Sequence, residues 1–244
     1  MSSRLFKRIR AIGLDSFQDY YEHLQQSKND IDEIVSLINV ITTNKTDFFR
    51  EPAHFEILRS KLLPELTKSP EFQKSKTINC WSAGCSSGQE PYTLAMVLDD
   101  FFVNSTGDFQ IIATDISTKV LLEAKTAVYS REVVTPIPGM YKNKYLMTGQ
   151  GKCQGLYRIR PELRDKIRFG RLNFMDDNYN IDLTMDIVFC RNVIIYFDWQ
   201  TKIDVITKLY NQLRPGGYLF VGHSETLNGV NLPLEKVIPT VFRK

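Results

Sequence analysis

The sequence predicts an α/β protein with a mostly parallel sheet, a small helical domain before it and a small antiparallel insert. Three observations support this fold class. Apolar residues recur at helical spacing up to about residue 41. From about residue 77, strand-like and helix-like segments alternate, which is typical of a parallel sheet covered by helices on both faces. Between about residues 131 and 171 this alternation is interrupted.

The composition is that of an ordinary globular protein. The 244 residues are 43% hydrophobic and 24% charged, with a formal net charge of +3, enough for one large domain with a small appendage. So small a charge gives no global sign of nucleic-acid or membrane binding. No segment approaches the roughly 18 apolar residues of a membrane span. Four cysteines without CxxC spacing or a secretory segment favour reduced thiols in a cytoplasm and argue against zinc.

Residues 1–41 are expected to form three helices. The stretch "RLFKRIRAIGLDSFQDYYEHLQQ" indicates a basic helix, a turn at Gly13 and a second helix begun by Asp15 or Ser16. Isoleucines and a valine then recur at helical spacing, and Asn29 or Asp30 is expected to cap this third helix.

The remainder, residues 42–244, is expected to carry the sheet. Its predicted strands are "TINCWSAG", "FQIIATD", "MDIVFC" and, after the turn "RPGG", "YLFVGH". The predicted helices are "QEPYTLAMVLDDF", "STKVLLEAKTAVY" and "WQTKIDVITKLYNQL", the last capped by Asp198. Within about residues 131–171, the short runs "YLMTGQG", "GLYRIR" and "KIRFGRL" are separated by glycine-containing turns. We interpret them as the antiparallel insert.

Two strand ends suggest a nucleoside-containing ligand. Gly84 and Gly88 flank small residues after the first strand, and no lysine follows Gly88, so the turn is poorly suited to a triphosphate; most such turns bind nothing. Asp115 ends the next strand, where a carboxylate can accept both hydroxyls of a ribose. Alternatively, Asp115 or Ser117 caps the following helix. Together the two features fit S-adenosylmethionine.

The segment "FCRNVIIYF", from Phe189 to Phe197, places Arg191 and Asn192 inside an apolar run. Burying an unpaired guanidinium is costly, so a strand that only fills a core should not contain one. Either the strand ends at Cys190 and both side chains lie in a ligand cleft, or Arg191 forms a satisfied salt bridge at the rim of the sheet.

Five motifs together resemble the CheR family of bacterial chemotaxis receptor methyltransferases: "TTNKTDFFRE", "WSAGCSSGQEPYTLAM", "ATDIS", "FCRNVIIYFD" and "LRPGGYLFVGHSE". They cover nearly the whole chain in order. The resemblance implies a class I S-adenosylmethionine methyltransferase fold, which is Rossmann-like, with a helical substrate-recognition domain that is short for the family. It also implies S-adenosylmethionine as methyl donor, S-adenosylhomocysteine as product, and glutamate side chains of chemoreceptors as substrate.

The resemblance also implies roles for particular residues. Arg50 would face the reacting centre and Tyr196 would reach the methyl-transfer site. Asp115 would hold the ribose hydroxyls, while Asn173 and Phe174 would bracket the adenine. The full set expected to contact the cofactor is Asn44, Thr46, Arg50, Glu90, Asp115, Asn173, Phe174, Arg191 and Asn192; no metal is expected.

The expected chemistry agrees with the residues available. Methyl transfer from a sulfonium is an in-line displacement, and a glutamate side chain with a pKa of about 4.3 is already ionised at pH 7. No general base is needed, and the sequence shows no His–Asp or Cys–His arrangement for one. A guanidinium such as that of Arg50 can orient a carboxylate through two hydrogen bonds.

The basic amino-terminal helix is a candidate docking site for the substrate. Arg4, Lys7, Arg8 and Arg10 carry four positive charges with no acid among the first ten residues. They either form a solvated helix face or bind the acidic, helical cytoplasmic bundle of a receptor. We expect a cytoplasmic monomer that does not bind nucleic acid and does not insert into a membrane.

Two alternative functions are compatible with the same fold. One is a methyltransferase acting on nucleic acid or a small molecule, although "CRNV" stands where DNA amino-methyltransferases carry an Asp/Asn-Pro-Pro-Tyr/Phe loop. The other is a non-catalytic sensor of S-adenosylmethionine. The presence of both Arg50 and Tyr196 favours the enzyme.

Overall fold

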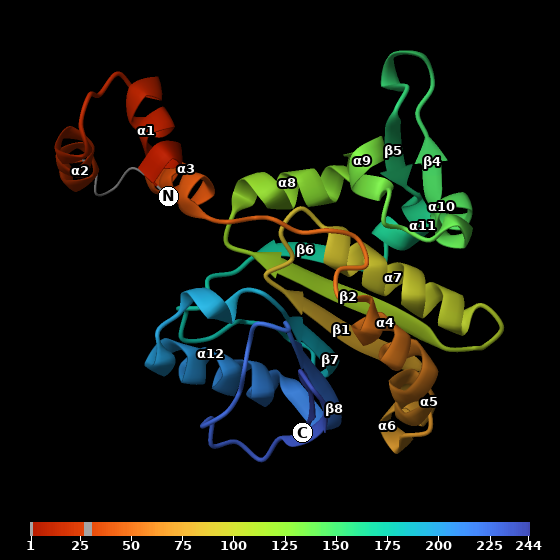
Figure 1. Cartoon of the computed structure of the whole chain (residues 1–244). Coiled ribbons are helices and arrows are strands. Elements are labelled where there is room, and N and C mark those ends of the chain that lie inside the picture. The colour runs from red at the N-terminus through yellow and green to blue at the C-terminus, as the bar shows by residue number, and fades with distance from the viewer. Residues whose placement is uncertain (1, 27–30) are drawn as a thin grey trace.

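The computed structural model describes residues 2–26 and 31–244. Its first part comprises α1 (Ser2–Ala11), α2 (Phe17–Gln26) and α3 (Ile31–Ile41), which Figure 1 shows beside one end of the sheet. The three predicted helices are confirmed, with Gly13 in the turn at a φ of 79°. The expected caps Asn29 and Asp30 lie outside the described residues. That the helical domain ends at residue 41 stays a prediction.

The three helices pack around a buried carboxylate. Glu33 of α3 is 5% exposed, accepts a hydrogen bond of 2.6 Å from the Tyr20 hydroxyl of α2 and pairs with Arg8 of α1. The hydrogen bond from Arg8 lowers the pKa of Glu33, and burial raises that of Tyr20 to about 12. Because one side chain binds partners on both other helices, it fixes their arrangement.

The core of the molecule is a seven-stranded sheet of order β6-β2-β1-β7-β8-β10-β9. Five strands are parallel: β1 (Thr77–Ala83), β2 (Asp108–Asp115), β6 (Ile167–Arg171), β7 (Met185–Cys190) and β8 (Leu213–Val221). Strand β10 (Val241–Arg243) runs antiparallel to both β8 and β9 (Glu235–Ile238). The predicted mostly parallel sheet is confirmed.

Each face of the sheet has its own core, because successive side chains of a strand point to opposite faces. On β7, Ile187 and Phe189 join the core shared with α7 (Gln89–Phe102), while Val188 and Cys190 join the core shared with α12 (Trp199–Gln212). The α7 face is also covered by α8 (Thr118–Thr126) and by α4 (Pro52–Ile57), α5 (Leu63–Leu66) and α6 (Pro70–Ser75), with a π-helical turn over Leu58–Leu62 between α4 and α5.

The antiparallel insert differs from its prediction in one strand. Its sheet has the order β3-β5-β4, from β3 (Val128–Ser130), β5 (Leu156–Ile159) and β4 (Leu146–Thr148). Assigning "KIRFGRL" to it was wrong, because β6 pairs with β2 in parallel, Ile167 beside Ile111. Strand β2 lies far earlier in the chain, so the sequence pattern around β6 could not show this pairing. Three short helices, α9 (Arg131–Val134), α10 (Gly139–Tyr145) and α11 (Pro161–Arg164), complete the region.

Smaller differences occur at element ends. Helix α8 stops at Thr126 because Ala127 adopts a left-handed φ of 56°. The sequence "RPGG" lies inside β8 as an irregularity, with Gly216 at a φ of 77°, rather than as a turn before it. Asp198 caps α12 as predicted, accepting a hydrogen bond from the Thr201 amide at 2.9 Å. Over the described residues, every helix is too short or too polar to span a bilayer.

Candidate active site

A cavity of about 450 Å³ lies at the carboxyl ends of β1, β2 and β7. The strand order reverses there, since the chain continues to β2 and β6 on one side of β1 and to β7 and β8 on the other. Such a switch point is where ligands of open α/β sheets bind. The linker after α3 supplies one wall, at Ile41, Thr42, Thr43, Asn44, Lys45 and Thr46. Strand ends and loops supply the rest, at Arg50, Gly84, Ser86, Glu90, Thr114, Asp115, Ile116, Leu172, Asn173, Phe174, Arg191, Asn192, Val193, Tyr196 and Phe197.

The cavity gathers the residues that the resemblance assigned to the cofactor. All nine of them line it, as does Tyr196, although they come from five separate segments of the chain. The four basic residues of α1 are not among its lining residues. The role of each residue within the cavity stays a prediction.

The Asp115 carboxylate is held at the cavity by two backbone amides. Its two carboxylate oxygens accept hydrogen bonds from the amides of Ser86 and Ser117, both at 2.9 Å, and burial raises its pKa. A carboxylate oxygen has two lone pairs, so each retains capacity toward the cavity. The cap of α8 is Ser117, whose hydroxyl accepts a hydrogen bond from the Val120 amide. The N-cap of α8 is therefore Ser117 and not Asp115.

Gly84 allows two loops to meet at the floor of the cavity. It has a φ of 85°, and a Cβ there would lie 2.5 Å from Cγ2 of Val193. The turn was expected to bring backbone close to a ligand, but the closest approach at Gly84 is to the loop that follows β7. Cys85 beside it is buried, which raises the pKa of its thiol well above the usual value.

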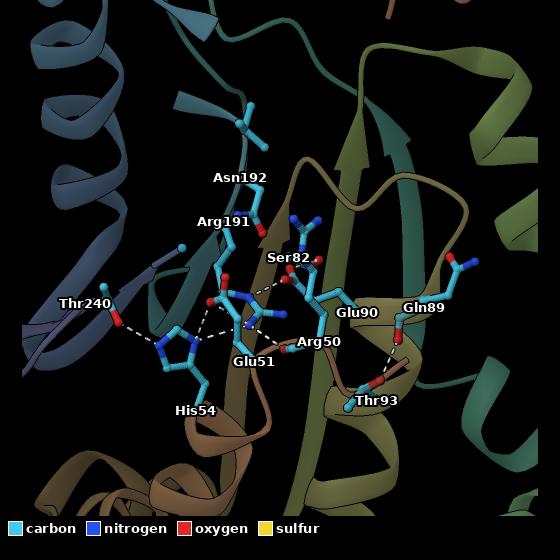
Figure 2. A network of polar contacts seen from close by, with 12 residues as sticks. Arg50, Glu51, His54, Ser82, Gln89, Glu90, Thr93, Arg191, Asn192 and Thr240 are labelled. Atoms are coloured by element: carbon cyan, nitrogen blue, oxygen red, sulfur yellow. Dashed lines mark hydrogen bonds and ion pairs between the residues drawn. The ribbon is translucent and has the colours of Figure 1, made fainter. Parts of the chain in front are cut away.

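Arg191 is buried at the cavity floor and satisfied on several sides (Figure 2). Its Nε donates to the Glu90 carboxylate at 2.7 Å and its Nη1 donates to the carbonyl of Arg50 at 2.8 Å. The other Glu90 oxygen accepts a hydrogen bond from the Ser82 hydroxyl at 2.7 Å. Strand β7 ends at Cys190, as expected. Arg191 lines the cavity, as the first interpretation of this segment proposed, and it also forms a salt bridge, as the alternative proposed. It fixes the position of Glu90.

Glu51, His54 and His223 form a cluster whose ligand atoms lie within 4.8 Å of one another. The Arg191 guanidinium already lies 3.1 Å from Nδ1 of His54 and 3.4 Å from the Glu51 carboxylate. Burial, and after it the charge of Arg191, lowers the pKa of His54 to about 4. His54 is therefore neutral at pH 7, accepting from Arg191 and directing its Nε2 to the Thr240 hydroxyl at 2.7 Å. A guanidinium in this position disfavours a metal ion.

The loop after β7 is folded around the buried carboxylate of Glu225. One oxygen accepts hydrogen bonds from the amides of Val193 and Ile194, and the other from those of Asn192 and Gly222. Asn192 has a left-handed φ of 60°, and this strained backbone is held in place by the four hydrogen bonds. Glu225 thereby positions the residues that lead to Tyr196.

Arg50 is partly buried at the cavity, and Tyr196 is exposed there. The Arg50 guanidinium donates to the carbonyl of Lys45 at 3.2 Å. In residues 2–26 and 31–244 it has no carboxylate within ion-pair distance, in contrast to Arg191. The Tyr196 side chain is 62% exposed at the cavity. The guanidinium of Arg50 and the phenol of Tyr196 are thus available to a substrate.

The aromatic rings of Phe174 and Phe197 line the cavity. Phe174 packs at 6.2 Å from Phe197 and at 6.0 Å from Tyr179, measured between ring centroids. Asn173 accepts a hydrogen bond from the Met175 amide at 3.0 Å, which fixes the turn. Both ring contacts of Phe174 are edge-to-face, and Phe174 and Phe197 give this part of the cavity an apolar lining that suits a purine base.

The four basic residues of α1 differ in their contacts. Arg8 is paired inside the domain with Glu33, and Arg4 donates to the Thr42 carbonyl at 2.6 Å. Lys7 and Arg10 are exposed, and neither has an ion pair within the described ranges. If α1 docks an acidic partner, these two are its available charges.

The strand order, the antiparallel strand β10 between β8 and β9, and the cavity at the carboxyl ends of β1, β2 and β7 together define a class I S-adenosylmethionine-dependent methyltransferase. The family described as CheR methyltransferase, SAM binding domain, matches residues 44–242, so the chain belongs to the CheR methyltransferase family. Over its whole length it is 38% identical to the chemotaxis protein methyltransferase of Borreliella burgdorferi, of which the match covers 85%. It is 36% identical to that of Salmonella typhimurium over 93% of this chain and 76% of that protein.

Several residues at or next to the cavity were not predicted from the sequence. Among them, Thr42 and Lys45 of the linker line the cavity. His54 and Glu225 do not line it, but they form hydrogen bonds with Arg191 and with the loop after β7, respectively. The signal for Glu225 was present, because "GHSE" belongs to a quoted motif to which no role was given. His54 lies outside all five quoted motifs, so none of them pointed to it.

Proposed function

We propose that this methyltransferase transfers the methyl group of S-adenosylmethionine to glutamate side chains of chemoreceptors. The observation that carries the proposal is Arg50, a guanidinium at the cavity without a carboxylate partner among the described residues. A substrate carboxylate would supply that partner. The family membership and the curated relatives, which are named chemotaxis protein methyltransferases, support the same substrate class.

The two arginines of the cavity differ in what they can bind. Arg191 has a side chain that is 2% exposed and is committed to Glu90, to Glu51 and to a backbone carbonyl. Arg50 is held by one neutral carbonyl. Because a carboxylate can accept two parallel hydrogen bonds from a guanidinium, a carboxylate that reaches Arg50 would engage donors that the single carbonyl leaves unused.

The remaining residues have roles consistent with this reaction. Asp115 would accept hydrogen bonds from the ribose hydroxyls, Phe174 would pack against the adenine, and Glu90 would face the charged amino-acid portion. When bound, the cofactor supplies a methyl group on a sulfonium. Because a glutamate carboxylate is ionised at pH 7, the protein has to align two reactants and exclude water, which can be worth about 7–11 kcal/mol in favourable cases.

The partner is proposed to be the helical cytoplasmic bundle of a chemoreceptor. Lys7 and Arg10 on α1 give the helical domain an exposed positive charge suited to glutamate-rich helices. The proposal places the protein in the cytoplasm as a monomer.

Labelled S-adenosylmethionine offered with receptors, DNA and tRNA tests the proposal. We expect label in the receptor as a base-labile ester. Arg50→Ala should lower the rate at least about a hundredfold, on the order of 2.7 kcal/mol in barrier, whereas the exposed Arg168→Ala serves as a matched control. Labelled nucleic acid would favour the alternative methyltransferase. Cofactor binding without any transfer would favour the sensor, and a wild-type rate for Arg50→Ala would refute its role.

A further inference from the structure

A chain of hydrogen bonds surrounds Asp115 and connects the two parts of the molecule. Asn39, near the end of α3, accepts a hydrogen bond of 2.7 Å from the Ser117 hydroxyl. The Ser117 amide donates to one oxygen of Asp115, and the Ser86 amide donates to the other. The Ser86 hydroxyl donates to the carbonyl of Asn44 at 2.8 Å. The chain thus begins and ends on the segment that joins the helical domain to the sheet.

Asn39 is fixed by further contacts with the start of α8. Its side-chain oxygen also accepts from the Lys119 amide at 3.3 Å, and its side-chain nitrogen donates to the Thr118 hydroxyl at 3.2 Å. Asn39 is absent from the cavity lining, which begins at Ile41. Its effect on a ligand is therefore indirect.

The segment between Asn39 and Asn44 is itself a wall of the cavity. Thr42 and Thr43 lie within it, and Arg4 of α1 donates to the carbonyl of Thr42 and lies 3.4 Å from the hydroxyl of Thr43. Figure 1 shows this linker leading from α3 across the end of the sheet toward α4. Helical-domain side chains thus hold the wall at one end, and the turn after β1 holds it at the other.

We propose that Asn39 is a positioning residue that couples docking of the helical domain to binding of the cofactor. The proposal rests on the proposed role of Asp115 at the ribose. Through Ser117, Asn39 orients that carboxylate, and through the linker it sets the cavity wall. Because coupling between two binding events is reciprocal, cofactor binding stabilises the docked helical domain, and displacement of that domain weakens the cofactor.

Calorimetry of S-adenosylhomocysteine binding tests the role of Asn39. Asn39→Ala should weaken binding roughly five- to tenfold, the effect of losing one or two ordinary hydrogen bonds. The control Asn104→Ala makes the same change at an exposed turn. Asp115→Ala should weaken binding more. If Asp115→Ala weakens binding of S-adenosylhomocysteine but Asn39→Ala does not, the proposed coupling is wrong while the role of Asp115 stands. If Asp115→Ala leaves the affinity unchanged, the assignment of Asp115 to the ribose, on which the coupling rests, is wrong.

Hydrogen exchange tests the same coupling in the wild-type chain and then in the variant. Saturating S-adenosylhomocysteine should slow amide exchange in α1, which contributes no residue to the cavity. Asn39→Ala should abolish that slowing while retaining protection of β1 and β2. If the ligand protects β1 and β2 of the wild-type chain but leaves α1 unchanged, the coupling is refuted even where the variant fails to fold.

Discussion

At the scale of single residues, surroundings decide what a charged or titratable group does. Arg191 and Arg50 lie at the same cavity, yet one is enclosed by acids and the other faces a single carbonyl. The sequence predicted that both would lie near the cofactor, because each falls in a recognisable motif. The resemblance assigned Arg50 to the reacting centre, but the sequence could not show which acids enclose Arg191, because its partners are 101 to 141 residues away in the chain.

The buried His54 makes stability depend on pH. Its pKa is about 4 in the folded protein, against 6.5 ordinarily. As pH falls from 6.5 toward 4, the unfolded chain binds a proton that the folded protein does not, so the free energy of unfolding decreases. The loss approaches about 3 kcal/mol at 1.36 kcal/mol per pKa unit.

Urea unfolding between pH 7 and pH 4.5 measures this loss. His54→Asn keeps an acceptor for Arg191 but does not titrate, so its stability should fall less steeply than that of the wild-type protein. The matched variant His23→Asn, at a partly exposed position of α2, should follow the wild-type curve. Parallel curves for wild type and His54→Asn would contradict the assignment.

At the scale of elements, the loop after β7 depends on one distant carboxylate. Glu225→Ala would leave four backbone amides, of Asn192, Val193, Ile194 and Gly222, without their acceptor. Because an unsatisfied buried donor costs about 1–3 kcal/mol, we expect a loss of at least roughly 3 kcal/mol in urea unfolding, together with weaker S-adenosylhomocysteine binding. Glu235→Ala, on the exposed side of β9, is the control. Wild-type stability for Glu225→Ala would show that water replaces the carboxylate.

Elements were predictable where their pattern is local. The helix of Gln89–Phe102 and the strand of Met185–Cys190 follow from continuous apolar runs between clear ends. The terminal hairpin of β9 and β10 was missed because both strands are short and Pro239 lies between them. Likewise, β6 is defined by pairing with β2, which no neighbouring residue encodes.

At the scale of the whole molecule, the exposed charges of α1 should serve docking alone. Lys7→Glu with Arg10→Glu should raise the KM for receptor severalfold at low ionic strength, since exposed ion pairs are each worth about 0–1 kcal/mol and are screened by salt. The Kd for S-adenosylhomocysteine should be unchanged. Reversing Arg4 or Arg8 is a poorer test than the sequence suggested, because Arg4 holds the cavity wall and Arg8 pairs with Glu33.

The control for this experiment is Lys74→Glu with Lys236→Glu, which changes net charge equally at exposed positions elsewhere. If both double variants raise KM alike, the effect is one of overall charge. If neither does, α1 is a solvated surface and the receptor docks elsewhere.

The attachment of the cavity wall to both parts of the chain limits how such proteins can be recombined. A chimaera joined at residue 41 would take Asn39 and Arg4 from one parent and their partners Ser117 and Thr42 from the other. Exchanging helical domains to redirect the enzyme to another receptor would therefore also alter its affinity for the methyl donor. A graft that carries residues 1–46 together with a matched start of α8 would keep the two properties independent.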